Sequence, residues 1–203
     1  MRYTPPPMFT GIVQGLGTVR GLTRSEIEIA APEGWSDGLR PGASVAVNGV
    51  CLTIAALSDG AFRANLSPET FSRTTFGTIR AGIRVNLERA VTPTDALDGH
   101  LVLGHVDAVG TIKGLHRDGD GWVMIVGYPP AHRGLVAEKG SVAVDGISLT
   151  PYGLDGTMFR CAVIPETYER TNVQDRRTGD PVNIEFDVLA KYVEWMVHGV
   201  HDD

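Results

Sequence analysis

Short runs of alternating apolar and polar residues dominate the chain and predict a structure built from β-strands. The segments from Ser44 to Leu52 and from Val182 to Phe186 are typical of these runs, which Gly, Pro, Asp and Asn residues separate. Such spacing is typical of β-barrels and β-sandwiches. Pro68 and Pro165 each precede an acidic residue and predict a short helical turn, because both residue types are favoured where a helix begins. The pattern therefore predicts the all-β fold class.

The pattern occurs twice along the chain. Residues 45–53 return at 142–150, residues 68–74 at 165–171 and residues 85–88 at 182–185, each 97 residues later. Gly17-Thr18-Val19 returns 93 residues later at Gly110-Thr111-Ile112, so the second copy has a longer loop. A repeat of this length indicates two structural units. We expect an N-terminal unit at 1–94, with 1–7 as an extended, proline-rich lead-in, and a C-terminal unit at 95–187.

The residues after the repeat follow a helical pattern instead. Apolar residues recur at helical spacing over 188–197, and the first unit has no counterpart of this segment. A terminal helix with this much apolar surface predicts docking on another subunit. We therefore expect residues 188–203 to form an oligomerisation helix.

Composition and charge exclude several classes of function. Of the residues, 42% are hydrophobic and 21% charged, no apolar run reaches membrane-spanning length, and the start has no apolar core of signal-peptide length. We expect a cytoplasmic protein. The net charge of −6, with scattered basic residues, argues against nucleic acid as a partner. The cysteines Cys51 and Cys161 lie far apart, and the histidines form no HExxH motif, so no metal site is expected.

Nucleotide cofactors are also not expected. Gly15-Leu16-Gly17 lacks the rest of a dinucleotide fingerprint, and no phosphate-binding lysine motif is present. The sequence thus predicts a protein that works without a cofactor.

One repeated strand carries a small polar face. Ser148 and Thr150 alternate with apolar residues, as Cys51 and Thr53 do in the first copy. A single polar face is consistent with an ordinary solvent-facing strand, and a single cysteine with an inert buried thiol. Retention of the polar pair in both copies favours a site.

Four further side chains have both structural and functional interpretations. His100 and His105 are five residues apart, so a regular strand would place them on opposite faces and give them different roles. Glu69 and Glu166 follow the prolines that begin the helical turns, where capping is the simpler explanation.

Seven motifs together resemble the riboflavin synthase family. They cover nearly the whole chain from Met8 and are the segments 8–13, 48–53, 68–75, 85–90, 99–107, 145–150 and 187–192. The resemblance implies two tandem closed Greek-key β-barrels and a C-terminal α-helix. It implies a homotrimer in which the N-terminal barrel of one subunit faces the C-terminal barrel of the next. It also implies the reaction of two 6,7-dimethyl-8-ribityllumazine molecules, in which a four-carbon unit is transferred to give riboflavin and 5-amino-6-ribitylaminouracil.

The resemblance also implies which residues act in catalysis and in substrate binding. It assigns Ser44, Cys51, Glu69 and Thr70 to the N-terminal half-site, and His105, Asp145, Ser148 and Thr150 to the C-terminal half-site, with Phe9 closing over a ligand. The implied catalytic set is His105, Ser148, Cys51, Ser44 and Asp145, in which His105 is the candidate for proton transfer because imidazole titrates near neutral pH. The implied substrate-binding set is Phe9, Thr10, Gly11, Val13, Asn48, Cys51, Thr53, Ser67, Glu69, Thr70, Gly104, His105, Lys139, Ser148, Thr150, Pro165 and Thr167.

Three positions depart from the family pattern. Asp98 replaces a glycine, Leu103 replaces a polar residue, and Pro151 follows Thr150 where a strand residue is expected. Since proline cannot donate a hydrogen bond to a neighbouring strand, we expect the strand to end or lie at an edge there. Two alternatives therefore stay open: a non-catalytic lumazine- or flavin-binding protein, and a specialised paralogue acting on a related pteridine.

Overall fold

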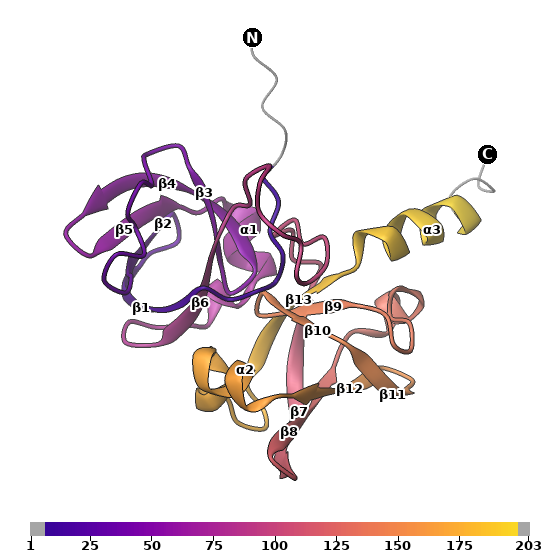
Figure 1. The fold of residues 1–203 in the computed structure, drawn as a ribbon. Coiled ribbons are helices and arrows are strands. Elements are labelled where there is room, and N and C mark those ends of the chain that lie inside the picture. The colour runs from indigo at the N-terminus through magenta and orange to yellow at the C-terminus, as the bar shows by residue number, and fades with distance from the viewer. Residues whose placement is uncertain (1–6, 199–203) are drawn as a thin grey trace.

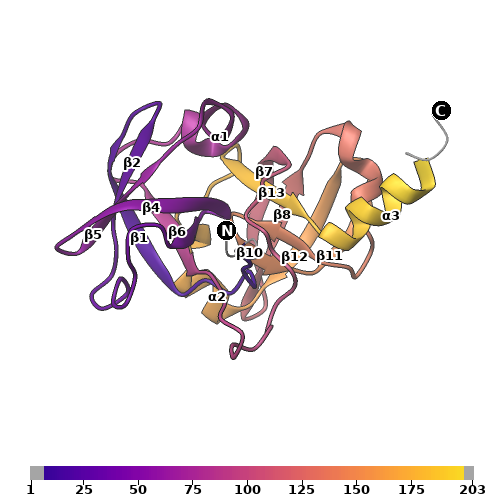
Figure 2. The same cartoon turned by 90° about the horizontal axis from the view of Figure 1, so that it is seen from above.

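The computed structural model describes residues 7–198 and consists of two β-structured units and one projecting helix. Figures 1 and 2 show the two units side by side. The predicted lead-in 1–7 lies outside the described residues except for Pro7.

The first unit is a closed six-stranded barrel. Its strands follow the order β1-β2-β5-β4-β3-β6, so neighbours in the barrel are not always neighbours in the chain. Alternate side chains such as Ile27, Ile29, Val45 and Leu87 point inward and are buried. The elements are β1 (Gly15–Leu22), β2 (Glu26–Ala30), β3 (Ser44–Val47), β4 (Val50–Ser58), β5 (Ala61–Asn65), α1 (Pro68–Arg73), η1 (Thr75–Gly77) and β6 (Arg84–Arg89).

The second unit has the same strand order but is a curled sheet. Its order is β10-β9-β13-β7-β8-β12-β11, and its two ends, β10 and β11, are consecutive in the chain. Its own core includes Ile112, Val126 and Phe159. The elements are β7 (Ala108–Asp118), β8 (Gly121–Gly127), η2 (Pro130–Leu135), β9 (Val142–Val144), β10 (Ile147–Leu149), β11 (Pro151–Asp155), β12 (Met158–Val163), α2 (Pro165–Arg170), η3 (Asn172–Asp175) and β13 (Pro181–Phe186).

Pro151 accounts for the difference between the two units. Strand β4 of the first unit pairs with both β3 and β5, whereas its counterpart is divided into β10, which pairs with β9, and β11, which pairs with β12. The strand ends at Leu149 and restarts at Pro151, because proline has no backbone N–H to donate. The predicted strand end is therefore confirmed, and the expected closed barrel is complete in the first unit only.

The C-terminal helix projects from the second unit. Helix α3 (Val188–His198) confirms the helical pattern, and none of its residues is buried. Figure 1 shows it in yellow, directed away from both units. Its exposed apolar side chains are Leu189, Tyr192, Val193, Trp195, Met196 and Val197.

The two units pack against each other through a pair of equivalent turns. A Cβ atom added at Gly49 would lie 2.7 Å from the backbone nitrogen of Gly146, and one added at Gly146 would lie 2.6 Å from that of Gly49. The preceding residues, Asn48 and Asp145, both have φ of 46°. Only glycine allows the two backbones to approach this closely.

A buried polar network surrounds these turns and joins the units. Asn86 Nδ2 donates to the carbonyl oxygen of Asp145 at 2.9 Å, and Asn183 Nδ2 donates to that of Asn48 at 2.9 Å. The Asp145 carboxylate also accepts from Asn183 N and from Arg176. Since Asn48 and Asp145 are 0% and 1% exposed, the structure assigns both side chains to the interface between the units, a correction of the expected binding and catalytic roles.

We expect Gly49→Ala to lower the free energy of unfolding by at least about 2 kcal/mol, because the added methyl group meets the facing backbone. Gly60→Ala is the matched control: Gly60 has a similar φ of 67° but open space around it, so it should lose only about 1 kcal/mol. Denaturant unfolding of both variants measures the difference. Equal losses would show that the contact at Gly49 contributes nothing.

Candidate functional site

The segment that leads into each unit lies against a strand of the other unit. The backbone N–H of Ser148 in β10 donates to the carbonyl oxygen of Gly11 at 2.8 Å, and that of Cys51 in β4 donates to Gly104 at 2.9 Å. A Cβ atom at Gly11 would lie 2.7 Å from Ser148 Cβ, and one at Gly104 would lie 2.5 Å from Cys51 Cβ. The polar strand of each unit is therefore completed by the backbone of the other.

Two buried glutamates anchor these crossing segments. Glu88 accepts from the backbone N–H groups of Thr10 at 2.6 Å and Gly11 at 3.0 Å, and from the Thr10 hydroxyl at 2.8 Å. Burial raises the pKa of the Glu88 carboxyl, and these hydrogen bonds lower it in part. Glu88 is 3% exposed and ends the repeated Val-Asn-apolar-Glu motif.

Glu185 holds the second crossing segment in the same way. It accepts from Leu103 N at 2.7 Å, Gly104 N at 2.8 Å and His105 N at 3.1 Å. Burial raises the pKa of its carboxyl, and hydrogen bonds with the backbone oppose the shift. The sequence interpretation missed both glutamates, although an acidic residue repeated at the end of an apolar strand was an available signal.

The first candidate half-site is a cavity of about 460 Å³ between the first barrel and residues of the second unit, among them His132. Cys51 of β4, Glu69 and Thr70 of α1, and Gly104 and His105 of the crossing segment line it. The exposed His105 thus lies with the N-terminal barrel, a correction of its expected place in the C-terminal half-site. The cause is the chain crossing, which carries the start of the second unit onto the first.

Neighbouring polar residues position the lining of this cavity. Ser44 faces Thr53 across β3 and β4, and its side chain lowers the pKa of the Cys51 thiol. Ser67 caps α1, because its Oγ accepts from Thr70 N at 2.9 Å and lies 2.8 Å from Thr70 Oγ1. The expected residues of the N-terminal half-site are therefore brought together around β4 and α1.

The second candidate half-site centres on Ser148. Its Oγ lies 2.7 Å from His100 Nδ1, and His100 is 8% exposed. Burial lowers the pKa of His100 and favours the neutral imidazole, and its Nε2 has no partner among the described residues. His100 was not among the expected site residues, because its distance from Ser148 in the sequence hides this contact.

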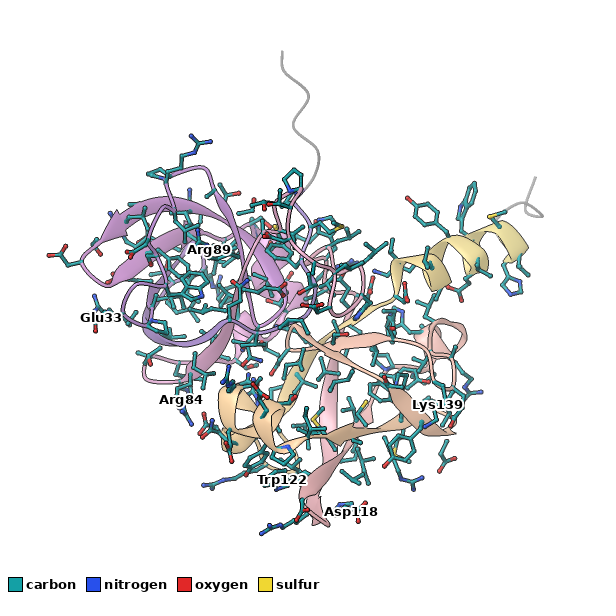
Figure 3. All side chains as sticks on the ribbon, in the orientation of Figure 1. Glu33, Arg84, Arg89, Asp118, Trp122 and Lys139 are labelled. Carbon is teal, nitrogen blue, oxygen red and sulfur yellow. The ribbon has the colours of Figure 1, made fainter. Side chains whose placement is uncertain are left out.

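The remaining expected residues lie in several places. Thr150 is exposed directly after β10, and Pro165 and Thr167 lie on α2. Val13 packs on the core of the second unit. Lys139 has its ammonium 5.1 Å from the centre of the Tyr152 ring, and Figure 3 shows it on the side of the second unit away from the first barrel.

Phe9 lies away from both half-sites. Its side chain is 0% exposed and packs with Val102, Ala46 and Ala143 between the units. Its backbone pairs with that of Val102. The expectation that Phe9 closes over a ligand is therefore corrected in this structure: hydrophobic burial places its ring in the interface.

In residues 7–198, no group of three or more His, Cys, Asp or Glu side chains could hold a metal ion. None of the described helices is long and apolar enough to span a membrane.

Comparison with known proteins supplies the deciding observation. The lumazine binding domain family matches residues 10–90 and 103–187. A riboflavin synthase of Mycobacterium tuberculosis is 43% identical over 92% of this chain and 96% of its own, and one of Photobacterium phosphoreum is 40% identical over 92% and 88%. This chain belongs to the riboflavin synthase family.

Solved structures share the fold at lower identity. LumP complexed with 6,7-dimethyl-8-(1'-D-ribityl) lumazine has a TM-score of 0.80 and 21% sequence identity, over 87% of this chain and 98% of LumP. LumP complexed with riboflavin gives 0.81 at the same identity. Both confirm the predicted fold of two tandem β-structured units.

The thiol in the first half-site is held in its neutral form. Burial raises the pKa of Cys51, the hydrogen bond with Ser44 lowers it, and the negative charge of Glu185 raises it. Cys161 lies inside the second unit, where burial raises its pKa to about 12. At neutral pH the Cys51 side chain is therefore a weak hydrogen-bond donor rather than a ready nucleophile.

We expect alkylation of Cys51 by iodoacetamide to keep accelerating through pH 9, because the thiolate reacts and a raised pKa delays its formation. Ser44→Ala should slow the reaction further at each pH, since it removes the hydrogen bond that lowers the pKa. Peptide mass spectrometry follows Cys51 and uses buried Cys161 as an unreactive internal control. A rate that levels off below pH 8, or that rises in Ser44→Ala, would contradict this assignment.

Proposed function

We propose that the chain catalyses the riboflavin synthase reaction, in which two 6,7-dimethyl-8-ribityllumazine molecules give riboflavin and 5-amino-6-ribitylaminouracil. The observation that carries the proposal is the duplicated half-site, in which each polar strand is completed by the other unit's leading segment. A reaction between two identical molecules needs two related binding places. The units 1–94 and 95–187 are proposed as the two lumazine-binding domains, and no metal, nucleotide or other cofactor is proposed.

The two half-sites differ in the groups that they offer. His105 and Cys51 lie in the first, and the Ser148–His100 pair lies in the second. The reaction requires a proton to leave a methyl group of one lumazine before its carbon adds to the other. His105 is exposed, lines the cavity and is proposed to carry this proton, because histidine is the side chain most often used for proton transfer in enzymes. Holding the two rings in the reactive orientation lowers the activation free energy. In well-oriented reactions this effect amounts to roughly 7–11 kcal/mol.

Assembly is proposed to bring the half-sites into contact. We infer a homotrimer in which the first half-site of one subunit faces the second half-site of the next. Helix α3 supports this, since Tyr192, Trp195 and Met196 are 62–66% exposed. Its Lys191 also pairs with Asp107 at 2.6 Å, which connects the helix to the segment that carries His105. A cytoplasmic location stays a prediction.

The alternatives become outcomes of one assay. The fold is shared with LumP, so a ligand-binding role is the first alternative. Asp98 is exposed, and Leu103 contributes its backbone N–H to Glu185, so neither of these departures alters a group that lines the first cavity. A paralogue acting on a related pteridine remains the second alternative.

We expect the purified protein, incubated with 6,7-dimethyl-8-ribityllumazine and a chelator but no nucleotide, to form riboflavin and 5-amino-6-ribitylaminouracil in equal amounts. Chromatography with absorbance detection measures both products over time. A stable complex without turnover would support the binding-protein alternative, and turnover of another pteridine alone would support the paralogue.

We expect His105→Ala to lower kcat by about 10²-fold with an unchanged melting temperature, because its ring is exposed and proposed to transfer a proton. His100→Ala should instead lower the melting temperature, since His100 is buried and bonded to Ser148. Added imidazole should partly restore His105→Ala. Equal loss of activity in both variants, accompanied by unfolding in both, would remove His105 from the chemistry.

We expect Trp195→Glu to dissociate the trimer at micromolar concentration and to lower activity in proportion, because a charge would be buried between subunits. Leu154→Glu, at an exposed position on β11, is the control and should retain both. Sedimentation velocity with parallel assays measures the effect. A Trp195→Glu protein that sediments and turns over like the native one would show that α3 is not the interface.

A further inference from the structure

The two units differ at one place where their backbones are closely equivalent. In the first hairpin Val19 pairs with Ile29 and Gly21 with Glu28, and in the second Ile112 pairs with Val126 and Gly114 with Ile125, with the same irregularity between the two pairs. Continuing this register to the hairpin tips makes Arg24 the counterpart of Arg117 and Ser25 the counterpart of Trp122. The 97-residue repeat makes Phe71 of α1 the counterpart of Tyr168 of α2.

In the second unit these positions form a layered stack. The indole of Trp122 lies on the ring of Tyr168, with centroids 3.7 Å apart and planes 3° apart. The guanidinium of Arg117 lies 6.0 Å from the centre of the Trp122 ring, which is at the upper limit for a cation–π contact. Figure 3 labels Trp122 beside α2. Hairpin and helix are thus joined through one planar bicyclic ring.

The first unit has the arginine and the helix aromatic residue of this stack, but it has no aromatic ring between them. Arg24, Ser25 and Phe71 line a cavity of about 750 Å³, together with Leu66, Pro68 and Val109. Ser25 is too small to reach Phe71 as Trp122 reaches Tyr168. Cavities of roughly 300–1,000 Å³ with mainly apolar walls are typical of small-molecule sites.

A buried hydroxyl adds a second observation at this groove. Thr75 also lines it, is 1% exposed, and has no hydrogen-bond partner for Oγ1 among the described residues. Its counterpart Asn172 has its side chain fully engaged in the network between the units. Buried polar atoms without partners are uncommon in native proteins, and this hydroxyl, which is itself shielded from solvent, marks a difference between the two units beside the groove rather than a group that faces a ligand.

The groove is separate from the candidate half-site. Helix α1 lies between them: Glu69, Thr70 and Arg73 line the half-site, whereas Pro68, Phe71 and Ser72 line the groove. Thr74 is the one residue that contributes to both. A molecule in the groove would therefore contact the opposite side of the helix that carries Thr70.

We propose that this groove is a second small-molecule site, which takes a planar bicyclic aromatic molecule stacked on Phe71 beneath Arg24. The bound ring occupies the place that Trp122 occupies in the second unit. This groove favours a flat, neutral or weakly anionic ring system. Phe71 offers a stacking surface, Arg24 a positive charge, and Leu66 and Val109 apolar walls. The site does not depend on the proposed catalytic activity.

Indole is the probe, because it is the ring of Trp122 without its backbone. We expect it to bind the native protein at one site per chain with a Kd on the order of 1 mM, the range for a ligand of this size. Phe71→Leu should weaken binding roughly threefold to tenfold, since it removes the stacking surface but keeps an apolar side chain. Titration followed by ligand-observed NMR measures both.

Ser25→Trp tests the proposal independently, because it supplies the missing ring from the chain itself. This variant should lose indole binding and gain a few degrees in melting temperature, while Asp59→Trp, at the tip of the β4–β5 hairpin, should change neither. Saturating riboflavin, which addresses the half-site, should not displace indole. Undiminished indole binding in Ser25→Trp, displacement by riboflavin, or no saturable binding to the native protein would each overturn the proposal.

Discussion

Two buried carboxylates hold the architecture in place. Glu88 and Glu185 each receive hydrogen bonds from the backbone of a segment that crosses to the other unit. A carboxylate taken out of water is costly unless it is well hydrogen-bonded, so these two residues stabilise the fold only when the crossing segments lie where they do. Both half-sites depend on this, because the segments that the glutamates hold carry Gly11 and Gly104 onto the polar strands.

Duplication explains the shape of the site, and divergence explains its chemistry. The equivalent positions 51 and 148 carry a thiol and a hydroxyl, and only the hydroxyl contacts a buried imidazole. Ser67 caps α1 through its side chain, whereas Ile164 at the same position of α2 makes no such bond and is 61% exposed. In the proposed reaction one lumazine gives four carbons and the other accepts them. Two pockets with equivalent backbone structure but different side chains suit these two roles.

Much of the fold could be read from the chain. Alternation and turn residues predicted the strands, the 97-residue repeat predicted two related units, and helical spacing predicted α3. Pro151 even indicated where the second barrel is interrupted, because the missing N–H acts locally. The candidate site was predicted less completely. Cys51, Glu69, Thr70 and Ser148 came from the repeated polar strand and the family motifs, but His100, Glu88 and Glu185 were missed.

The sequence by itself determined the strands, the repeat, the terminal helix and the residue types available for chemistry, since periodicity, turn propensity and the lack of a proline donor act over a few residues. Only the tertiary structure decided that the leading segments cross over. That crossing places His105 beside Cys51, and the packing of the two units buries Phe9, Asn48 and Asp145 between them, while His100 contacts Ser148 within the second unit. These contacts join residues about 50 to 135 positions apart, and their free energy comes from burial and hydrogen bonding across the interface, which local sequence patterns do not record.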